Sequence, residues 1–162
     1  MIAFFQIKNW FPWFRKAETT EAAGRERRRN KRTIPERGST VLVVDDSRTV
    51  RNVLQKMLQQ GGFDTLEAAD GQSAVDLAMT HQPDLIIMDV VMPGMNGFQA
   101  TRQLRKAPGT RAIPIIIMSG NEQATEEFWV IRIGANDFMA KPFTRFEVYR
   151  RIERILYNNE II

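Results

Sequence analysis

The hydrophobic positions of the chain follow two alternating patterns from residue 40 onward. Continuously apolar runs, typical of parallel strands buried on both faces, occur at 40–44, 85–89 and 113–119. Shorter runs at 63–68 and 136–140 predict two more strands. The segments between them carry apolar residues every three or four positions, which is typical of helices packed on a sheet. This alternation predicts an α/β fold, with a doubly wound five-stranded parallel sheet and right-handed crossovers.

The first helix of this pattern has clear limits. Ser47 is a suitable N-cap, and Gly61 and Gly62 follow the last apolar position. The expected apolar stripe consists of Val50, Val53, Leu54, Met57 and Leu58. We expect this stripe to lie against the sheet.

Four further helices are expected. Asp70 is the predicted cap of the second, and the pattern over 96–106 predicts the third. A more weakly amphipathic helix is expected over 122–133. Thr144 and Glu147 have the spacing of a capping box at the start of the last helix. The inner positions of that helix are Val148, Ile152, Ile155 and Leu156.

Composition narrows the possible chemistry. The 162 residues, 43% of them apolar and 26% charged, suffice for one ordinary domain with an extension. The sequence contains no cysteine, which excludes disulfides, thiol nucleophiles and zinc–thiolate sites. Its single histidine, His81, argues against histidine-based metal sites and catalytic triads.

The first sixteen residues form a segment of their own, rich in aromatic and basic side chains. Its aromatic residues are Phe4, Phe5, Trp10, Phe11, Trp13 and Phe14. The segment is too short and polar to span a bilayer, and Pro12 limits any helix in it. Aromatic residues beside Lys8, Arg15 and Lys16 suit a membrane interface or a docking partner. An unstructured extension, or a start codon assigned too far upstream, is the alternative.

Residues 17–39 are polar and basic, and we expect them to form a disordered linker. Residues 1–38 hold ten basic and four acidic residues, a net charge of +6, whereas residues 39–162 hold thirteen and fifteen, a net charge of −2. The basic character therefore belongs to the N-terminal part. A basic run without interleaved recognition residues predicts electrostatic attraction only, so specific nucleic-acid binding is not expected.

Polar residues mark the carboxyl ends of four predicted strands. Asp45 and Asp46 follow the first strand, Asp89 ends the third, Ser119 ends the fourth, and Lys141 follows the fifth. Carboxyl ends of parallel strands meet at one edge of the sheet, where ligands bind. Clustered carboxylates repel one another, and a hard cation such as Mg²⁺ relieves this repulsion. With the lysine and the serine hydroxyl, the set is suited to hold a phosphoryl group.

Four segments in this order, VVDDS, DLIIMDVVMPGMNG, IIIMSG and GANDFMAKPF, resemble the receiver domain of two-component response regulators. The resemblance covers about residues 40–157. It implies a flavodoxin-like fold with strand order 2-1-3-4-5 and a receiver domain over 40–158. It also implies a cis peptide bond before Pro142.

The resemblance implies roles for the residues at the sheet edge. Asp89 would be the phosphoacceptor, receiving the phosphoryl group from a sensor histidine kinase. Lys141 and Ser119 would contact that group, and Phe138 would be the switch aromatic that turns inward with Ser119. The implied Mg²⁺ ligands are Asp45, Asp46, Asp89 and the backbone carbonyl of Val91. A downstream protein would bind the face formed by the fourth helix, fifth strand and fifth helix.

A closer resemblance concerns the segments MPGMNGFQATRQLRK and AIPIII and Trp129, which are similar to the single-domain regulators of the pilus chemosensory system that controls twitching motility. We therefore expect a phosphoacceptor that is not a conventional enzyme, although it catalyses its own phosphorylation and slow autodephosphorylation. We expect it in the cytoplasm, where the segment 1–16, which departs from the family, is a candidate contact with the inner face of the membrane.

Other functions need features that this sequence lacks. A haloacid-dehalogenase-like phosphohydrolase would need a second aspartate two residues after Asp45, where Ser47 stands. A flavin-binding module would need a phosphate-binding loop after the first strand, where Asp45 and Asp46 would repel a phosphate. The alternative that stays open is a phosphorylation-independent binding module, tethered to a membrane or nucleic acid by the basic N-terminal part.

Overall fold

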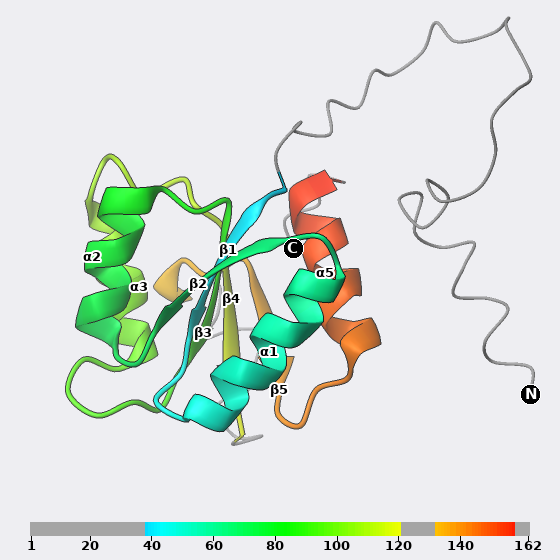
Figure 1. Cartoon of the computed structure of the whole chain (residues 1–162). Coiled ribbons are helices and arrows are strands. Elements are labelled where there is room, and N and C mark those ends of the chain that lie inside the picture. Colours follow the sequence, from blue (N-terminus) through cyan, green and yellow to red (C-terminus); the bar gives the residue numbers. More distant parts are fainter. Residues whose placement is uncertain (1–37, 121–131, 158–162) are drawn as a thin grey trace, which may run out of the picture. The chain divides into compact units, whose positions relative to one another are not determined.

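The computed structural model describes residues 38–120 and 132–157 (Figure 1). The described elements are β1 (Thr40–Val44), α1 (Arg48–Gln60), β2 (Asp64–Ala68), α2 (Gly71–His81), β3 (Leu85–Asp89), α3 (Gly97–Lys106), β4 (Ile115–Ser119), β5 (Asp137–Ala140) and α5 (Arg145–Tyr157). Most of the helix expected over 122–133 lies outside the described residues. The other expected elements are present, with bounds that differ by one or two residues at most ends.

The five strands form one parallel sheet in the order β2-β1-β3-β4-β5, which confirms the predicted topology. β3 lies in the middle, and all of its five residues are buried. In the register of the sheet, Asp89 is paired with Met118, and Ser119 with Ala140. The carboxyl ends of β3, β4 and β5 therefore lie side by side.

Helices cover both faces of the sheet, α2 and α3 on one face and α1 and α5 on the other (Figure 1). Alternate strand residues pack into the two hydrophobic cores, one on each face of the sheet. Leu42 of β1 packs with the α2 and α3 side, whereas Val41 and Val43 pack with the α1 and α5 side. Burial on both faces explains why these strands are continuously apolar.

The predicted helix caps are present. Ser47 Oγ accepts the Val50 amide at 3.5 Å, and Asp70 Oδ1 accepts the Ser73 amide at 2.8 Å. At the start of α5, the Thr144 amide donates to Glu147 Oε2 at 2.8 Å, and the Glu147 amide donates to the Thr144 hydroxyl at 3.2 Å. This is the reciprocal bonding of a capping box.

The prediction that Val53 of α1 packs against the sheet is wrong. Val53 is 41% exposed, whereas Leu54 and Leu58 are fully buried and Val50 and Met57 are half-buried. A helix that lies on a flat sheet buries only a limited arc of its surface. Val53 falls at the edge of that arc, so its apolar character does not report contact with the core.

Two backbone features shape the loops near the carboxyl edge of the sheet. A Cβ atom on Gly97 would collide with the backbone carbonyl of Asp89, so the start of α3 approaches the end of β3 as closely as only glycine allows. The Lys141–Pro142 peptide bond is cis, as expected.

Among the described residues, no helix is both long and apolar enough to cross a bilayer.

Candidate functional site: an acidic cluster with a bridging lysine

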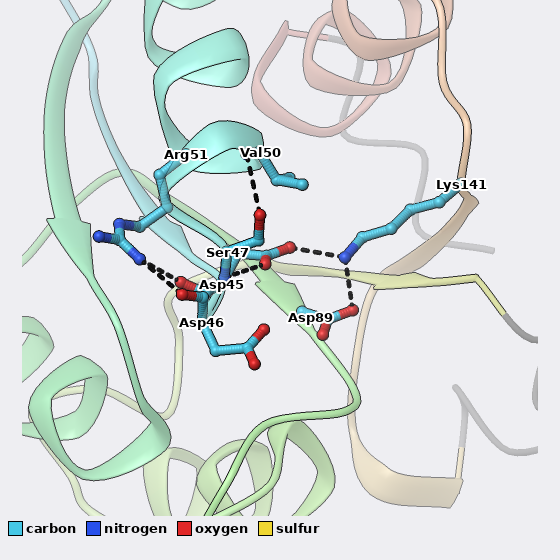
Figure 2. A network of polar contacts seen from close by, with 7 residues as sticks. All are labelled: Asp45, Asp46, Ser47, Val50, Arg51, Asp89 and Lys141. Carbon is cyan, nitrogen blue, oxygen red and sulfur yellow. Dashed lines mark hydrogen bonds and ion pairs between the residues drawn. The ribbon is translucent and has the colours of Figure 1, made fainter.

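Three charged side chains meet at the carboxyl edge of the sheet (Figure 2). Lys141 follows β5 and its Nζ lies 2.6 Å from Asp45 Oδ2 and 2.9 Å from Asp89 Oδ1. Asp45 is fully buried and Asp89 is 5% exposed. The single lysine therefore pairs with two buried carboxylates, from the ends of β1 and β3, and offsets their combined charge only in part.

Asp46 completes the acidic cluster. One carboxylate oxygen from each of Asp45, Asp46 and Asp89 lies within 4.8 Å of the others. Asp46 is exposed, whereas the other two are buried, so the cluster opens to solvent on the side of Asp46. Carboxylate oxygens in such a group are the ligands that hard divalent cations prefer, and the donor set therefore fits Mg²⁺.

The loop between β1 and α1 positions Asp45 through its own backbone. The Ser47 amide donates to Asp45 Oδ1 at 2.9 Å, while Asp45 Oδ2 accepts from Lys141. Both carboxylate oxygens thus have a partner, which satisfies a fully buried charge. Since Ser47 also caps α1, the start of the helix and the orientation of the carboxylate are set together.

Burial and ion pairing shift the pKa values of Asp89 and Lys141 in opposite directions. Burial raises the pKa of the Asp89 carboxyl, and its hydrogen bond and charge pairing with Lys141 do not fully offset this. Burial lowers the pKa of Lys141, but its hydrogen bonds to Asp45 and Asp89 outweigh burial and hold that pKa above its ordinary value. Lys141 is therefore charged at neutral pH, and the ionised Asp89 is only partly compensated.

The other predicted site residues are placed less directly. Ser119 is buried at the end of β4, and its backbone carbonyl accepts the Lys141 amide at 2.8 Å. Phe138 of β5 is half-buried and packs against the core on the α2 and α3 side. Val91 lies in the loop after β3 with its side chain 69% exposed. The metal-ligand role of its carbonyl and the switch role of Phe138 stay predictions.

One residue close to this cluster, Arg51, is not among the predicted site residues. Arg51 Nη1 donates to the backbone carbonyls of Asp45, at 2.7 Å, and Asp46, at 3.2 Å (Figure 2). Its Nε also pairs with Glu67. An arginine in the first turns of an amphipathic helix is usually a solvated surface residue. Its position four residues after the capping Ser47, just beyond an acidic pair, was the only available signal.

The strand order and the acidic edge define an α/β domain of the CheY-like class. The family model for the response regulator receiver domain matches residues 41–153. The chain therefore belongs to the response regulator receiver domain family. It is 44% identical over 116 residues to protein PilH of Pseudomonas aeruginosa, a match that covers 72% of this chain and 96% of PilH.

Solved structures agree with this assignment. The chemotaxis response regulator CheY4 of Vibrio cholerae is 30% identical and superposes with a TM-score of 0.69, over 74% of this chain and 99% of that one. The receiver domain of the sensor histidine kinase PA1611 from Pseudomonas aeruginosa is 34% identical, with a TM-score of 0.67 over 72% and 96% of the two chains. The PA1611 domain was solved with a magnesium ion coordinated in its active site cleft.

Proposed function

We propose that this protein is a single-domain response regulator that accepts a phosphoryl group from a histidine kinase on Asp89 and signals by binding a partner. The observation that carries this is the position of Asp89, buried at the end of the central strand and paired with Lys141 beside two further carboxylates. The resemblance of the segments around Pro93 and Ile113 to the regulators of the pilus chemosensory system, and the similarity to the chemotaxis response regulator CheY4, support a role in twitching motility or chemotaxis.

Magnesium is the proposed cofactor. Asp45, Asp46 and Asp89 would hold it, together with the backbone carbonyl of Val91. When bound, the ion supplies positive charge that offsets the phosphoryl oxygens and lowers the repulsion between the carboxylates. The magnesium in the PA1611 receiver domain supports this assignment by family likeness.

The proposed reaction needs little from the protein beyond position and charge. A carboxylate oxygen of Asp89 attacks the phosphorus of a phosphohistidine, and the phosphorus–nitrogen bond breaks as the imidazole nitrogen takes the electron pair. Lys141 Nζ, already 2.9 Å from Asp89 Oδ1, offsets the charge that accumulates on the phosphoryl oxygens. Ser119 would donate its hydroxyl to one of those oxygens. The protein promotes its own phosphorylation and is not a conventional enzyme.

Phosphorylation would then bias the partner-binding surface. Ser119 would move toward the phosphoryl group, and Phe138 would turn into the vacated space. In this structure Phe138 is half-buried in β5 and packs against the core on the α2 and α3 side. A downstream protein would bind the face that includes β5 and α5, as a shift between existing states.

Intact-mass measurement tests the proposal. The full chain is incubated with a small phosphodonor and MgCl₂, beside an Asp89→Asn variant. We expect a phosphoryl adduct on the native protein only, and its loss when EDTA replaces the metal. A folded protein that binds Mg²⁺ but forms no adduct would instead indicate a phosphorylation-independent binding module.

For the whole chain we propose a receiver domain over 40–158, a basic linker over 17–39 and a membrane-contacting segment over 1–16. Six aromatic residues beside basic residues in that segment suit the headgroup region of an anionic bilayer. The protein would then be cytoplasmic and peripheral at the inner face of the membrane. Equal binding of the full chain and of residues 39–162 to anionic liposomes would rule this out.

A further inference from the structure

We propose that Arg51 is a positioning residue of the metal site, which holds the backbone of the acidic loop so that its carboxylates face Asp89. This inference rests on the proposed function of the cluster as a Mg²⁺ site. Arg51 contacts none of the three carboxylates directly in the described contacts. Its effect would pass through the peptide groups of Asp45 and Asp46.

The first support is the geometry of the contact. Nη1 of Arg51 donates to the carbonyl oxygens of two successive residues, Asp45 and Asp46 (Figure 2). Fixing two neighbouring carbonyls fixes the orientation of the peptide planes between and after them, and with them the direction of the attached side chains. Two of the three clustered carboxylates belong to these same two residues.

The second support is that Arg51 is itself held in place. Its side chain is only 12% exposed, and Nε lies 3.2 Å from Glu67 Oε2, a residue of β2. The planar guanidinium therefore ties the acidic loop to the neighbouring strand as well as to α1. A lysine, with one compact ammonium group, cannot make the carbonyl contacts and the Glu67 pair in the same geometry.

The charge of Arg51 and its positioning role predict opposite changes in Mg²⁺ affinity when the residue is replaced, so the two can be told apart. A positive charge close to a cation site repels Mg²⁺, so if Arg51 acted by charge alone, its removal would strengthen Mg²⁺ binding. If Arg51 acts by position, its removal weakens binding although a repelling charge is lost. Residues that orient metal ligands typically contribute about 10-fold or more to affinity.

The experiment is calorimetric titration of the full chain with MgCl₂, comparing the native protein with Arg51→Met, Arg51→Lys and Arg48→Met. Arg48 is the matched control, because it is exposed on the same turn of α1 and its replacement removes the same charge. We expect the Kd for Mg²⁺ to rise about 10-fold in both Arg51 variants and to stay unchanged, or fall slightly, in Arg48→Met.

Urea unfolding in EDTA keeps the result interpretable. Arg51→Lys retains the charge and most of the packing, so it reports on position even where Arg51→Met is too unstable to titrate. Mg²⁺ affinities of the Arg51 variants equal to or higher than the native value would overturn the inference, whatever their stability.

The same titration separates this inference from the proposed function. If the Kd for Mg²⁺ rises in the Arg51 variants but Asp89 forms no phosphoryl adduct, the positioning role is supported and the phosphoacceptor role is contradicted. Normal phosphorylation with unchanged Mg²⁺ affinity in these variants does the reverse. A native protein that does not bind Mg²⁺ contradicts the metal site and the inference together.

Discussion

Lys141 and Asp89 form a 2.9 Å ion pair between the ends of β5 and β3, two strands that are not neighbours in the sheet. The lysine side chain reaches past the end of β4 to make this contact, and it continues to Asp45 at the end of β1. One cation thus connects the carboxyl ends of three parallel strands. Its removal should affect the stability of the fold as well as the chemistry of the site.

We expect Lys141→Met to lower the free energy of unfolding by about 2–3 kcal/mol in EDTA, because two buried carboxylates lose their cation. The loss should shrink when MgCl₂ is added, since a bound divalent cation would replace the missing charge. Urea unfolding at neutral pH measures both values, and Lys106→Met, at an exposed position, is the control. Equal losses with and without MgCl₂ would argue against a metal site at the cluster.

The raised pKa of Asp89 predicts how stability depends on pH. A carboxyl whose pKa is higher in the folded state than in the unfolded state favours folding when it is protonated, and this contribution is lost as pH rises through the folded pKa. Asn resembles the protonated form. In EDTA, Asp89→Asn should therefore match the native protein at about pH 4 and exceed its stability at about pH 8.

Urea titrations across this pH range measure the difference between the two proteins. Asp64→Asn, at an exposed carboxylate on β2, is the matched control. A stability difference between Asp89→Asn and the native protein that is constant with pH would show that burial does not penalise the Asp89 charge.

A third buried carboxylate, Asp137, connects β5 at the edge of the sheet to α5. Its side chain is 3% exposed and pairs with Arg151 at 2.8 Å and Arg154 at 2.6 Å, both from α5. Asp137→Asn should lower the free energy of unfolding by about 3 kcal/mol, because two partly buried guanidinium groups lose their counter-ion. Thermal and urea unfolding measure this. A loss no larger than that of Asp76→Asn, an exposed aspartate on α2, would contradict it.

Gly97 tests the close approach of α3 to β3. Alanine there would place a methyl group against the backbone of Asp89, and a shift of that backbone would also move the acceptor carboxylate. We expect Gly97→Ala to cost about 1–3 kcal/mol in urea unfolding and to slow phosphorylation by a small phosphodonor. Gly109→Ala is the control, because a Cβ atom there would make only an ordinary contact with Gln82. Similar behaviour of the two variants would mean that the turn adapts freely.

The sequence was most informative where physical constraints are strongest. A strand buried on both faces must be apolar throughout, so β1, β3 and β4 were recognisable at once. Because parallel strands end at a common edge, the meeting of Asp45, Asp89 and Lys141 could be predicted from their places in the chain. The structure brings these three into direct contact.

The sequence was least informative where a polar side chain hydrogen-bonds to backbone groups. Arg51 and Arg105 bond mainly to carbonyl oxygens, and any residue supplies such an oxygen, so no partner is visible in the sequence. Val53 shows the converse limit. An apolar residue at helical spacing indicates a face, but the width of the buried arc depends on how the helix lies on the sheet.

The N-cap of α2 gives a last prediction with its own internal control. The Asp70 carboxylate accepts the Ser73 amide at 2.8 Å, and this bond lowers the pKa of Asp70. A lowered carboxyl pKa means a contribution that is present above the unfolded pKa and is lost as pH falls through the folded pKa. Asp70→Ala should therefore cost about 1 kcal/mol at neutral pH and less in acid. Asp70→Asn keeps a capping oxygen that does not titrate. The stability of this variant should be near the native value at neutral pH, and the contribution of its cap should not fall in acid. Urea unfolding at both pH values checks this, and an Asp70→Ala penalty that does not change with pH would contradict the charged cap.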